Sequence, residues 1–464
     1  MSVEVPRWDV FERELRGPSG GNPFTEVAVS AEFRHRNRVL RVRGFYTGDG
    51  IYRIRFSPDQ VGHWRYRVRS NAAELDGAIG TFICGPPGAG NHGPVEVDGR
   101  AGFRYADGLR FYPFGTTCYH WTHQMDEAAE QRTLESLADS PYNKVRMCVL
   151  PTNAMRPPRI AFPEVAPGQL DKTRFDPEFF EHLERRIRDL RDLGIEADVI
   201  LFHPYDRGFW GVDTMTQDEE ERYLDYVVAR LGGYRNVWWS LSNEFDFNKA
   251  KTTGDWDRML RLVQRIDPYQ RLRSIHNGTR MYEYCEPYDF STPWTTHQCI
   301  QHWDTDQVPA WLSEVGKPVI IDEIGYEGEI ERRWGNLTGQ ELVDRVWLGV
   351  TRGGYVSHGE CFHERPFGPW ISVGGELYGE SSSRIAFLRD LLENRDETTT
   401  SFRYFGNRTP TYTELDLEPE RSYRVEYIDV WEMTIGETSG PVRGDARIAL
   451  PGRPYTALRI TEVA

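Results

Sequence analysis

Two glutamates of the sequence stand directly after strongly apolar segments that read as buried strands. Glu244 ends the segment VWWSLSNE, Glu323 ends the segment PVIIDE, and no cationic residue stands next to either one. A single glutamate at such a place is more often an ion-pair or helix-capping partner than a catalyst. Two of them can supply the proton donor and the attacking carboxylate that cleavage of a glycosidic bond with retention of configuration needs. We therefore interpret Glu244 and Glu323 as a candidate catalytic pair.

Aspartates close to both glutamates are rivals for these roles. Asp246 follows Glu244 by two residues, and Asp322 directly precedes Glu323. Successive side chains of a strand point to opposite faces, so Asp322 should point away from the pocket if Glu323 points into it. While one carboxylate of a pair is ionised, its charge raises the pKa of the other, which stays protonated until the first is esterified. One residue can then serve first as acid and later as base.

The segments that carry these residues belong to a regular alternation. From about residue 100, apolar runs alternate with amphipathic ones, which is typical of parallel strands joined by crossover helices. Eight strands are predicted, in the segments 111–121, 143–150, 196–206, 236–246, 271–278, 288–297, 318–328 and 354–363. This count predicts an α/β fold, a (β/α)8 TIM barrel. An open doubly wound sheet is the alternative, but the first segment lacks the Gly-rich phosphate-binding turn of that fold.

The helices between the strands are also well marked. The clearest one is 176–193, where Asp176 can cap the first turn, Pro177 suits the first helical position and Gly194 follows the end. Others are predicted to begin near residues 127, 217, 255, 308, 339 and 383.

Both ends of the chain read as β domains. Residues 1–90 contain short alternating segments separated by turn residues, which is typical of an Ig-like β-sandwich. The stretch CGPPGAGNHGP suits a linker, and alternation returns after about residue 396. We therefore predict an N-terminal sandwich (1–90), a catalytic barrel (100–395) and a small C-terminal β domain (396–464).

Polar and aromatic side chains follow the predicted strands. In a (β/α)8 barrel the residues at the C-terminal ends of the strands face the active site. Candidates for substrate binding at these ends are His120, Arg146, His203, Tyr205, Asn243, Trp294, His297 and Glu360. Two of them keep a second interpretation: Glu360 can bind a substrate hydroxyl or pair with an arginine such as Arg365, and Arg146 can reach the active site or form an ion pair between helix and barrel.

The two strand-end motifs point to a known family. SNE at 242–244 and IIDEIG at 320–325 resemble the ends of strands four and seven in the retaining clan of barrel glycoside hydrolases that contains cellulases and β-galactosidases. The resemblance implies that Glu244 is the acid/base, that Glu323 is the nucleophile and that Asn243 binds the 2-hydroxyl of the sugar. Arg146 resembles the strand-two arginine that keeps the nucleophile ionised.

The resemblance extends over nearly the whole chain but not to every site position. Residues 43–68 and 103–121 resemble the β-sandwich and the join to the barrel in uncharacterised bacterial candidate glycoside hydrolases that also carry a C-terminal β domain. Many clan members have a Tyr on strand six and a Trp on strand eight, where this sequence has Trp294/His297 and Glu360/Cys361. The difference concerns the substrate subsite and not the class of reaction.

Composition narrows the choice of partners. The formal net charge of −15 leaves no basic surface for nucleic acid or anionic lipid, so we expect a carbohydrate partner and neither nucleic acid nor membrane. No apolar run is long enough to cross a bilayer and no secretory signal opens the sequence, which predicts a cytoplasmic protein. The six cysteines form no CxxC pair and are expected to be free, mostly buried thiols. The oligomeric state stays open, and the accessory β domains favour a homo-oligomer.

A metal-dependent hydrolase is an alternative because eight of the twelve histidines follow predicted strands. His120 and His123 form an HxxH pair on a loop and not the HxH that lets one strand offer two ligands to a metal. We therefore expect no metal and no cofactor.

These observations predict an exo-acting retaining glycoside hydrolase that removes a terminal sugar from an oligosaccharide or small glycoside. Segments 151–175 and 365–380 are the expected walls of a closed pocket. A transglycosylase with the same two carboxylates, a metal-dependent barrel hydrolase and an inactive sugar-binding protein are the alternatives. Sequence spacing encodes neither the sugar, nor its anomer, nor the linkage.

Overall fold

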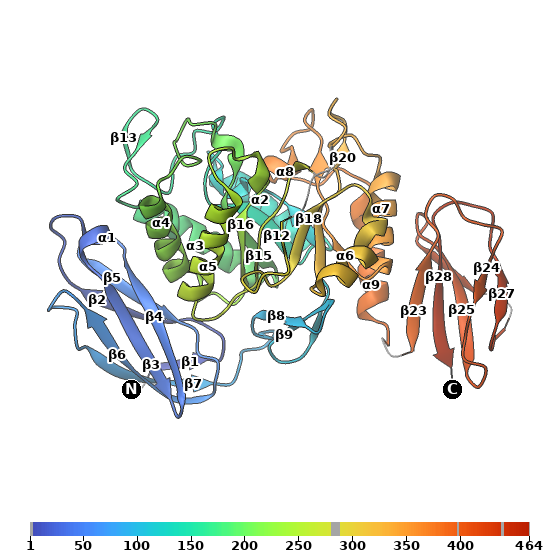
Figure 1. The fold of residues 1–464 in the computed structure, drawn as a ribbon, viewed down its shortest axis with the longest axis horizontal. Coiled ribbons are helices and arrows are strands. Elements are labelled where there is room, and N and C mark those ends of the chain that lie inside the picture. Colours follow the sequence, from blue (N-terminus) through green and yellow to red (C-terminus); the bar gives the residue numbers. More distant parts are fainter. Residues whose placement is uncertain (1–2, 280–287, 397–398, 438–439, 464) are drawn as a thin grey trace.

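The computed structural model describes residues 3–279, 288–396, 399–437 and 440–463, and it consists of a central barrel with strand-rich parts at both ends of the chain (Figure 1). The N-terminal strands lie below one side of the barrel, and the C-terminal strands stand beside it at the opposite end. No described helix is long and apolar enough to cross a membrane.

Eight parallel strands form the barrel, as the sequence predicts. They are β11 (Gly115–Thr117), β12 (Lys144–Cys148), β15 (Glu196–Phe202), β16 (Val237–Ser242), β17 (Arg273–Ser274), β18 (Gln298–Gln301), β19 (Val319–Glu323) and β21 (Tyr355–Val356). Two hydrogen-bonded runs, β11-β12-β15-β16-β17 and β18-β19-β21, contain all of them. Isolated parallel bridges from Thr116 to His358 and from His276 to Cys299 join the two runs and close the circle. The (β/α)8 prediction is confirmed.

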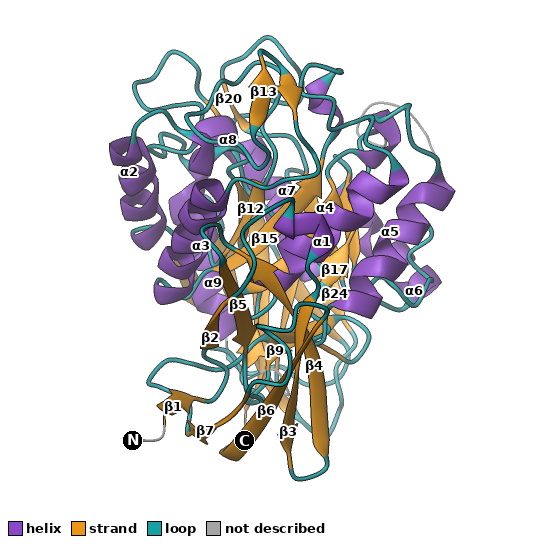
Figure 2. Cartoon of the chain, turned by 90° about the vertical axis from the view of Figure 1, so that its left-hand side faces the viewer, coloured by secondary structure: helices purple, strands orange, loops and turns teal. Residues whose placement is uncertain are grey.

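Helices surround the strands (Figure 2). The helices of the barrel are α2 (Glu127–Ala138), α3 (Pro177–Asp192), α4 (Gln217–Leu231), α5 (Thr253–Ile266), α6 (Val308–Val315), α7 (Gly339–Thr351), α8 (Trp370–Val373) and α9 (Ser381–Glu393). In α3 the side chain of Asp176 accepts hydrogen bonds from the amides of Glu178 and Phe179, and Gly194 beyond the end has a φ of +74°. These are the cap and the left-handed residue that the sequence predicts.

The sixth strand does not lie where the sequence predicts it. The predicted segment was 288–297, whereas β18 begins at Gln298. The amide of Thr295 meets the carbonyl of Thr292, a turn contact, so this part of the segment is not extended. Aromatic residues and threonines in 288–297 imitate a strand pattern, while the real strand, QCIQ, is short and has polar ends.

The lower end of the barrel is closed by a small sheet. It contains β8 (Val95–Asp98), β9 (Gly102–Tyr105) and β10 (Arg110–Phe111). Phe103 of β9 is fully buried and its ring contacts those of Trp238, His297 and Tyr355. These three residues lie near the starts of three barrel strands, so Phe103 plugs the N-terminal end and leaves the C-terminal end for the site.

The N-terminal strands form one hydrogen-bonded series in the order β1-β7-β6-β3-β4-β5-β2. Their bounds are β1 (Val3–Pro6), β2 (Phe11–Arg16), β3 (Val29–His35), β4 (Arg38–Tyr46), β5 (Ile51–Phe56), β6 (Gly62–Ser70) and β7 (Ile79–Gly85), and the short helix α1 (Pro23–Glu26) interrupts them. Phe11 stacks on Phe82 with ring centroids 4.2 Å apart. Because these residues belong to strands far apart in the order, the sheet folds back over its own core. The salt bridge from Arg55 to Glu184, 3.0 Å and fully buried, fixes this part to α3.

The C-terminal strands form a four-stranded sheet, β23-β28-β25-β26, and a two-stranded one, β24-β27. Their bounds are β23 (Thr400–Tyr404), β24 (Tyr412–Leu415), β25 (Ser422–Asp429), β26 (Thr434–Glu437), β27 (Ala446–Ala449) and β28 (Thr456–Val463). Tyr404 donates a hydrogen bond to Asp344 of α7 at 2.6 Å, which ties the sheet to the barrel. The boundaries at 1–90, 100–395 and 396–464 stay predictions.

Loops and short strands cover the upper, C-terminal end of the barrel (Figure 2). They include the hairpin of β13 (Glu164–Ala166) and β14 (Gln169–Leu170), and the pair of β20 (Glu327–Gly328) and β22 (Glu360–Cys361). Five cysteines are free and buried, while Cys285 lies outside the described residues.

Candidate active site

Glu323 is the last residue of β19 and is surrounded by hydrogen-bond donors. Its Oε1 lies 3.2 Å from Nη1 of Arg146 and 3.3 Å from Nε2 of His276, and it accepts a hydrogen bond from the hydroxyl of Tyr119. Burial by itself raises the pKa of the Glu323 carboxyl, but His276, Arg146 and Tyr119 outweigh burial and lower this pKa to about 2. Glu323 is therefore a carboxylate at neutral pH.

Glu244 follows β16 in the left-handed region, with a φ of +40°. Its described partners are neutral: the hydroxyl of Tyr205 donates to Oε2 at 2.5 Å, and Gln301 forms a second hydrogen bond. Burial, and after it the charge of Glu323, raises the pKa of Glu244 to about 8. Glu244 is therefore mostly protonated at neutral pH, which is the ionisation state opposite to that of Glu323.

Asn243 links the surroundings of the two glutamates. Nη2 of Arg146 donates to its Oδ1 at 2.7 Å, and its Nδ2 donates to the hydroxyls of Tyr205 at 2.6 Å and Tyr119 at 3.3 Å. Arg146 thus contacts both Glu323 and Asn243, and both contacts lie inside the barrel.

A fully buried charged layer lies beneath Glu323. Nζ of Lys144 is 2.7 Å from Asp198 and 2.7 Å from Asp322, and Nε of Arg146 is 3.9 Å from Asp322. Burial opposes ionisation of Asp322, but Lys144 and Arg146 hold its pKa far below the usual range. The aspartates therefore balance the two cations and support Arg146 from below.

Strict strand alternation does not describe Asp322. The register between β18 and β19 shifts by one residue at Gln301, opposite Glu323. Asp322 consequently contacts Lys144 of β12 and accepts from Cys299 of β18, contacts that only the barrel interior allows. It does not turn outward toward the helices but lies below the pocket, because the shift lets both neighbours face inward.

Asp246, the other rival, is used to hold loops together. It accepts hydrogen bonds from the amides of Gly278 at 2.7 Å and Thr279 at 3.0 Å, and from the hydroxyl of Thr279. Both of its oxygens are therefore occupied by the segment that follows β17.

Trp294 and His297 lie at the opposite end of the barrel from the glutamates. Because β18 begins at Gln298, both residues precede the strand and do not follow it. His297 packs on Phe103 and Trp238 at the closed N-terminal end of the barrel. The guanidinium of Arg261 lies over the ring of Trp294, 4.0 Å from the centroid of that ring. The prediction that these two residues end strand six is wrong, since it rested on the misplaced strand.

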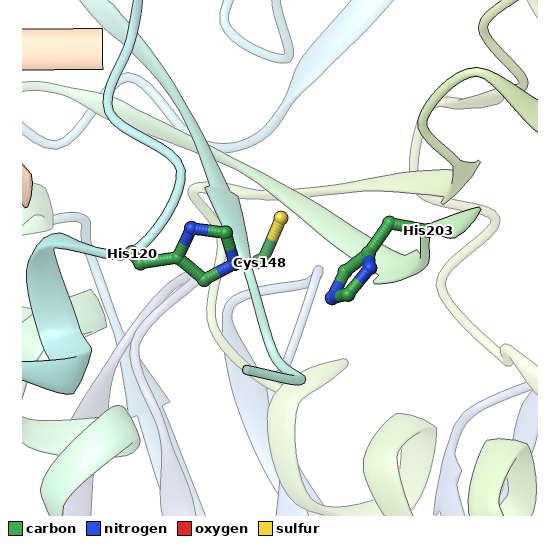
Figure 3. Close-up of side chains that lie close together, drawn as sticks. All are labelled: His120, Cys148 and His203. Atoms are coloured by element: carbon green, nitrogen blue, oxygen red, sulfur yellow. The ribbon is translucent and has the colours of Figure 1, made fainter. Parts of the chain in front are cut away.

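His120 and His203 lie close to Cys148 near the ends of the first three strands (Figure 3). Nε2 of His203 is 2.9 Å from the carbonyl of Leu150, and its Nδ1 accepts from the amide of Tyr205 at 3.2 Å. His203 also stacks on the ring of Tyr205, so it orients the residue that contacts Glu244. His120 is 3% exposed and packs against His123 and His203.

Glu360 belongs to a second cluster, with Glu327 and His358, and is 1% exposed. Its Oε2 accepts a hydrogen bond from the amide of Tyr378 at 2.7 Å. The alternative of a pair with Arg365 receives no support, because the guanidinium of Arg365 lies over the ring of Tyr378.

The structure adds four residues to the predicted site. Tyr119 and His276 contact Glu323, Gln301 contacts Glu244, and the hydroxyl of Tyr326 lies 3.4 Å from that of Tyr119. Tyr119 and His276 stand at the ends of predicted strands, so their position was a usable signal. Gln301 was hidden by the misplaced sixth strand.

The barrel and the buried glutamates at its C-terminal mouth define the class of barrel glycoside hydrolases, and comparison with known proteins agrees. The family model "Apiosidase-like, catalytic domain" matches residues 98–371. The chain belongs to this apiosidase-like family. Models of two domains of unknown function, DUF5060 and DUF5605, match residues 4–71 and 390–461.

Solved structures support the same class. A candidate glycoside hydrolase from Bacteroides vulgatus is 38% identical, with all of both chains covered and a TM-score of 0.92. A glycoside hydrolase family 5 protein from Bacteroides vulgatus is 14% identical over 80% of this chain and 94% of its own, with a TM-score of 0.61. At that identity the second likeness shows the fold alone. The search of curated proteins found no match.

Proposed function

We propose that the protein is an exo-acting retaining glycoside hydrolase in which Glu323 is the nucleophile and Glu244 is the acid/base. The observation that carries this proposal is the contrast between the surroundings of two buried glutamates: Glu323 lies 3.2 Å from the guanidinium of Arg146, which lowers its pKa, whereas burial raises the pKa of Glu244, whose described partners are neutral. A double displacement needs one carboxylate and one carboxylic acid at the same pH. Arg146 helps to keep Glu323 ionised, and the charge of Glu323 helps to keep Glu244 protonated.

In the first step the Glu323 carboxylate attacks the anomeric carbon, while the Glu244 carboxyl gives its proton to the glycosidic oxygen and the bond to the aglycone breaks. Formation of the ester removes the charge of Glu323, so the pKa of Glu244 falls and it becomes a base. In the second step Glu244 takes a proton from water, the water oxygen attacks the anomeric carbon, and Glu323 leaves as a carboxylate. The sugar is released with its original anomeric configuration.

Asn243 is proposed to bind the 2-hydroxyl of the sugar. Arg146 fixes its Oδ1, and its Nδ2 faces the hydroxyls of Tyr205 and Tyr119, between the groups that contact the two glutamates. A sugar hydroxyl placed here can exchange hydrogen bonds with the same network, so binding and catalysis share Arg146 as a support.

Exo action is supported by the small exposure of both glutamates. Glu244 is 8% exposed and Glu323 4%, and the segments 151–175 and 365–380 leave strand ends of the barrel mouth. In an open cleft that binds a polymer, we expect the two carboxylates to have larger exposed fractions than Glu244 and Glu323 have. Trp303, which is 51% exposed, stacks with His302 just after β18 and is a candidate platform for the aglycone or the next sugar.

The proposal is tested by hydrolysis of nitrophenyl glycosides in both anomers, as pyranosides and furanosides. Because the family is named after apiosidases, apiosides stand first in the panel. The substrate that is cleaved is then given to Glu323→Ala and Glu244→Ala with and without azide. We expect a glycosyl azide of inverted configuration from Glu323→Ala and one of retained configuration from Glu244→Ala.

Other outcomes decide against parts of the proposal. Full activity of Glu323→Ala contradicts the assignment of the nucleophile, and inversion by the wild type contradicts retention. Cleavage inside a labelled oligosaccharide contradicts exo action. Transfer to an added sugar acceptor in preference to water identifies a transglycosylase. Loss of the chemical step on chelation, with the fold and substrate binding unchanged, identifies a metal-dependent hydrolase.

A further inference from the structure

We propose that Glu327, His358 and Glu360 bind a divalent transition-metal ion that holds β20 against β22 at the mouth of the barrel. This site is separate from Glu244 and Glu323, and its role is structural. It replaces, for this part of the molecule, the expectation from the sequence that the protein holds no metal.

The backbone places the three side chains together. β20 pairs in parallel with β22, and Glu327 is the direct register partner of Glu360. His358 stands two residues before Glu360. One ligand atom from each of the three residues lies within 4.8 Å of the other two, and the residues are 3%, 1% and 1% exposed.

The cluster has two carboxylates and no permanent cation. Within the described ranges, neither Glu327 nor Glu360 has an arginine or lysine at ion-pair distance. The only ionisable basic side chain near them in these ranges is His358, whose Nε2 lies 3.4 Å from Oε1 of Glu360. Like charges directly opposite each other on paired strands are unfavourable. Buried charges are normally paired or coordinate a metal, so the cluster calls for a positive charge.

Two ligand atoms are free to accept this charge. Oε1 of Glu360 and Nε2 of His358 are both buried and have no hydrogen-bond partner in the part of the chain that the structure describes. The other oxygen of Glu360 is held by the amide of Tyr378 at 2.7 Å. The carboxylate of Glu327 is oriented by the start of α9: its Oε1 accepts from the amide of Glu380 at 2.7 Å, and its Oε2 accepts from the amide of Ser381 at 3.1 Å and from the hydroxyl of Ser381 at 2.5 Å.

The ring of His358 is held by a hydrogen bond at the nitrogen that does not face the carboxylates, as is usual for metal-binding histidines. Its Nδ1 lies 3.0 Å from Oγ1 of Thr116, which also accepts a hydrogen bond from Nε1 of Trp370 at 2.8 Å. If Nδ1 carries the proton and donates it to Thr116, the lone pair of Nε2 faces the carboxylates. Such an outer hydrogen bond fixes the tautomer and the ring orientation of metal-binding histidines.

The donor set identifies the kind of ion. One imidazole nitrogen with two carboxylates suits zinc or manganese, whereas calcium and magnesium prefer oxygen ligands alone. Gly379 leaves the space for the carboxylates, because a Cβ there would lie 2.3 Å from Oε2 of Glu327 and 2.7 Å from Oε1 of Glu360.

Two other clusters of potential ligands lack these properties. In the group His120, Cys148 and His203 (Figure 3), both ring nitrogens of His203 already have partners. In the group of Asp322, Cys299 and His276, the charge of Asp322 is balanced by Lys144. Both clusters contain a cysteine, and the proposed site does not, which allows a decisive spectroscopic test.

The test uses the full chain without a histidine tag, stripped with a chelator and reloaded with Zn²⁺. We expect about one ion per chain, and an X-ray absorption spectrum with nitrogen and oxygen neighbours at ~2.0–2.2 Å and no sulfur at ~2.3 Å. Less than a tenth of an ion per chain after reloading overturns the proposal. A sulfur neighbour also overturns it, since the ion then lies at one of the cysteine clusters.

Variants make the assignment specific. By calorimetric titration with Zn²⁺, Glu360→Gln should lose at least about 100-fold in affinity, and Thr116→Val, which removes only the outer hydrogen bond, roughly 10- to 100-fold. His120→Gln is the matched control and should bind Zn²⁺ as the wild type does. Unchanged affinity of Glu360→Gln overturns the proposal, and if that variant does not fold, the absorption spectrum of the wild type still decides.

Discussion

Two buried pairs of carboxylates differ in how their negative charges are balanced: Asp198 and Asp322 inside the barrel, and Glu327 and Glu360 where β20 pairs with β22. Asp322 and Asp198 face Lys144 and Arg146 at fixed, fully buried positions. Glu327 and Glu360 face one histidine, which carries a charge only when it is protonated. The first cluster has permanent counter-ions from the chain, and the second needs a proton or an ion from solution.

The two clusters therefore differ in whether the positive charge is a permanent part of the chain or can be exchanged with the solution. Beneath the proposed catalytic pair, a permanent cation keeps the ionisation state of Glu323 constant over a wide pH range, which a nucleophile needs. At the edge of the site, an exchangeable ion can order β20 and the adjoining Tyr326, whose hydroxyl is 3.4 Å from that of Tyr119. Four changes of single residues test this contrast.

The largest effect is expected when Lys144, one of the two permanent cations of the first cluster, is removed. Lys144→Met leaves Asp198 and Asp322 with an uncompensated charge in the barrel interior, and loss of one partner of a buried ion pair costs about 3–5 kcal/mol. Urea unfolding measures the change in the free energy of unfolding. The triple variant Lys144→Met, Asp198→Asn, Asp322→Asn should recover most of it. A loss below about 1 kcal/mol in the single variant means that the aspartates are not balanced by Lys144.

The next effect concerns catalysis. Arg146→Met removes a cation 3.2 Å from Glu323, so the pKa of Glu323 rises and less of it is ionised in acid. Activity requires the carboxylate, so the acid limb of kcat/KM against pH should move to higher pH. At the optimum we expect a loss of roughly 100- to 1000-fold, as for removal of one catalytic hydrogen-bond donor. An acid limb that stays in place contradicts the role of Arg146.

A smaller shift is expected on the other side of the profile. Tyr205 donates to Glu244 and favours its charged form, which lowers the pKa of Glu244. Tyr205→Phe should therefore raise this pKa, and because Glu244 must be protonated, the basic limb near pH 8 should move upward by about one unit, equal to one hydrogen bond to a charged group. A downward movement would show that Tyr205 stabilises the protonated form.

The smallest effect tests the second cluster. In metal-free protein, Glu360→Gln removes the repulsion between paired carboxylates and should raise the free energy of unfolding by about 0.2–1 kcal/mol. Added Zn²⁺ should stabilise the wild type and leave the variant unchanged. If the variant is instead less stable than the metal-free wild type, the carboxylates of the cluster are already balanced within the chain and no ion is needed.

The sequence alone was sufficient for the eight barrel strands with one exception, for the helix caps and for the flanking β structure, because these depend on local periodicity and on Pro, Gly and capping residues. It also proposed Glu244, Glu323, Asn243 and Arg146 as site residues, and the structure brings these side chains together, since residues at the ends of parallel strands converge wherever a barrel forms. Local patterns failed in segment 288–297, where aromatic residues in a turn imitated a strand.

The tertiary structure decided what depends on neighbours from distant parts of the chain. It shows that Tyr119, His276 and Gln301 reach the two glutamates, that Trp294 and His297 lie at the plugged end, and that Asp322 turns inward at a register shift. Only the folded barrel places Lys144 beside Asp322 and leaves Glu327 and Glu360 with no described lysine or arginine at ion-pair distance. The partners that balance a buried charge come from distant parts of the chain, so the spacing of residues in the sequence does not show whether that charge is balanced.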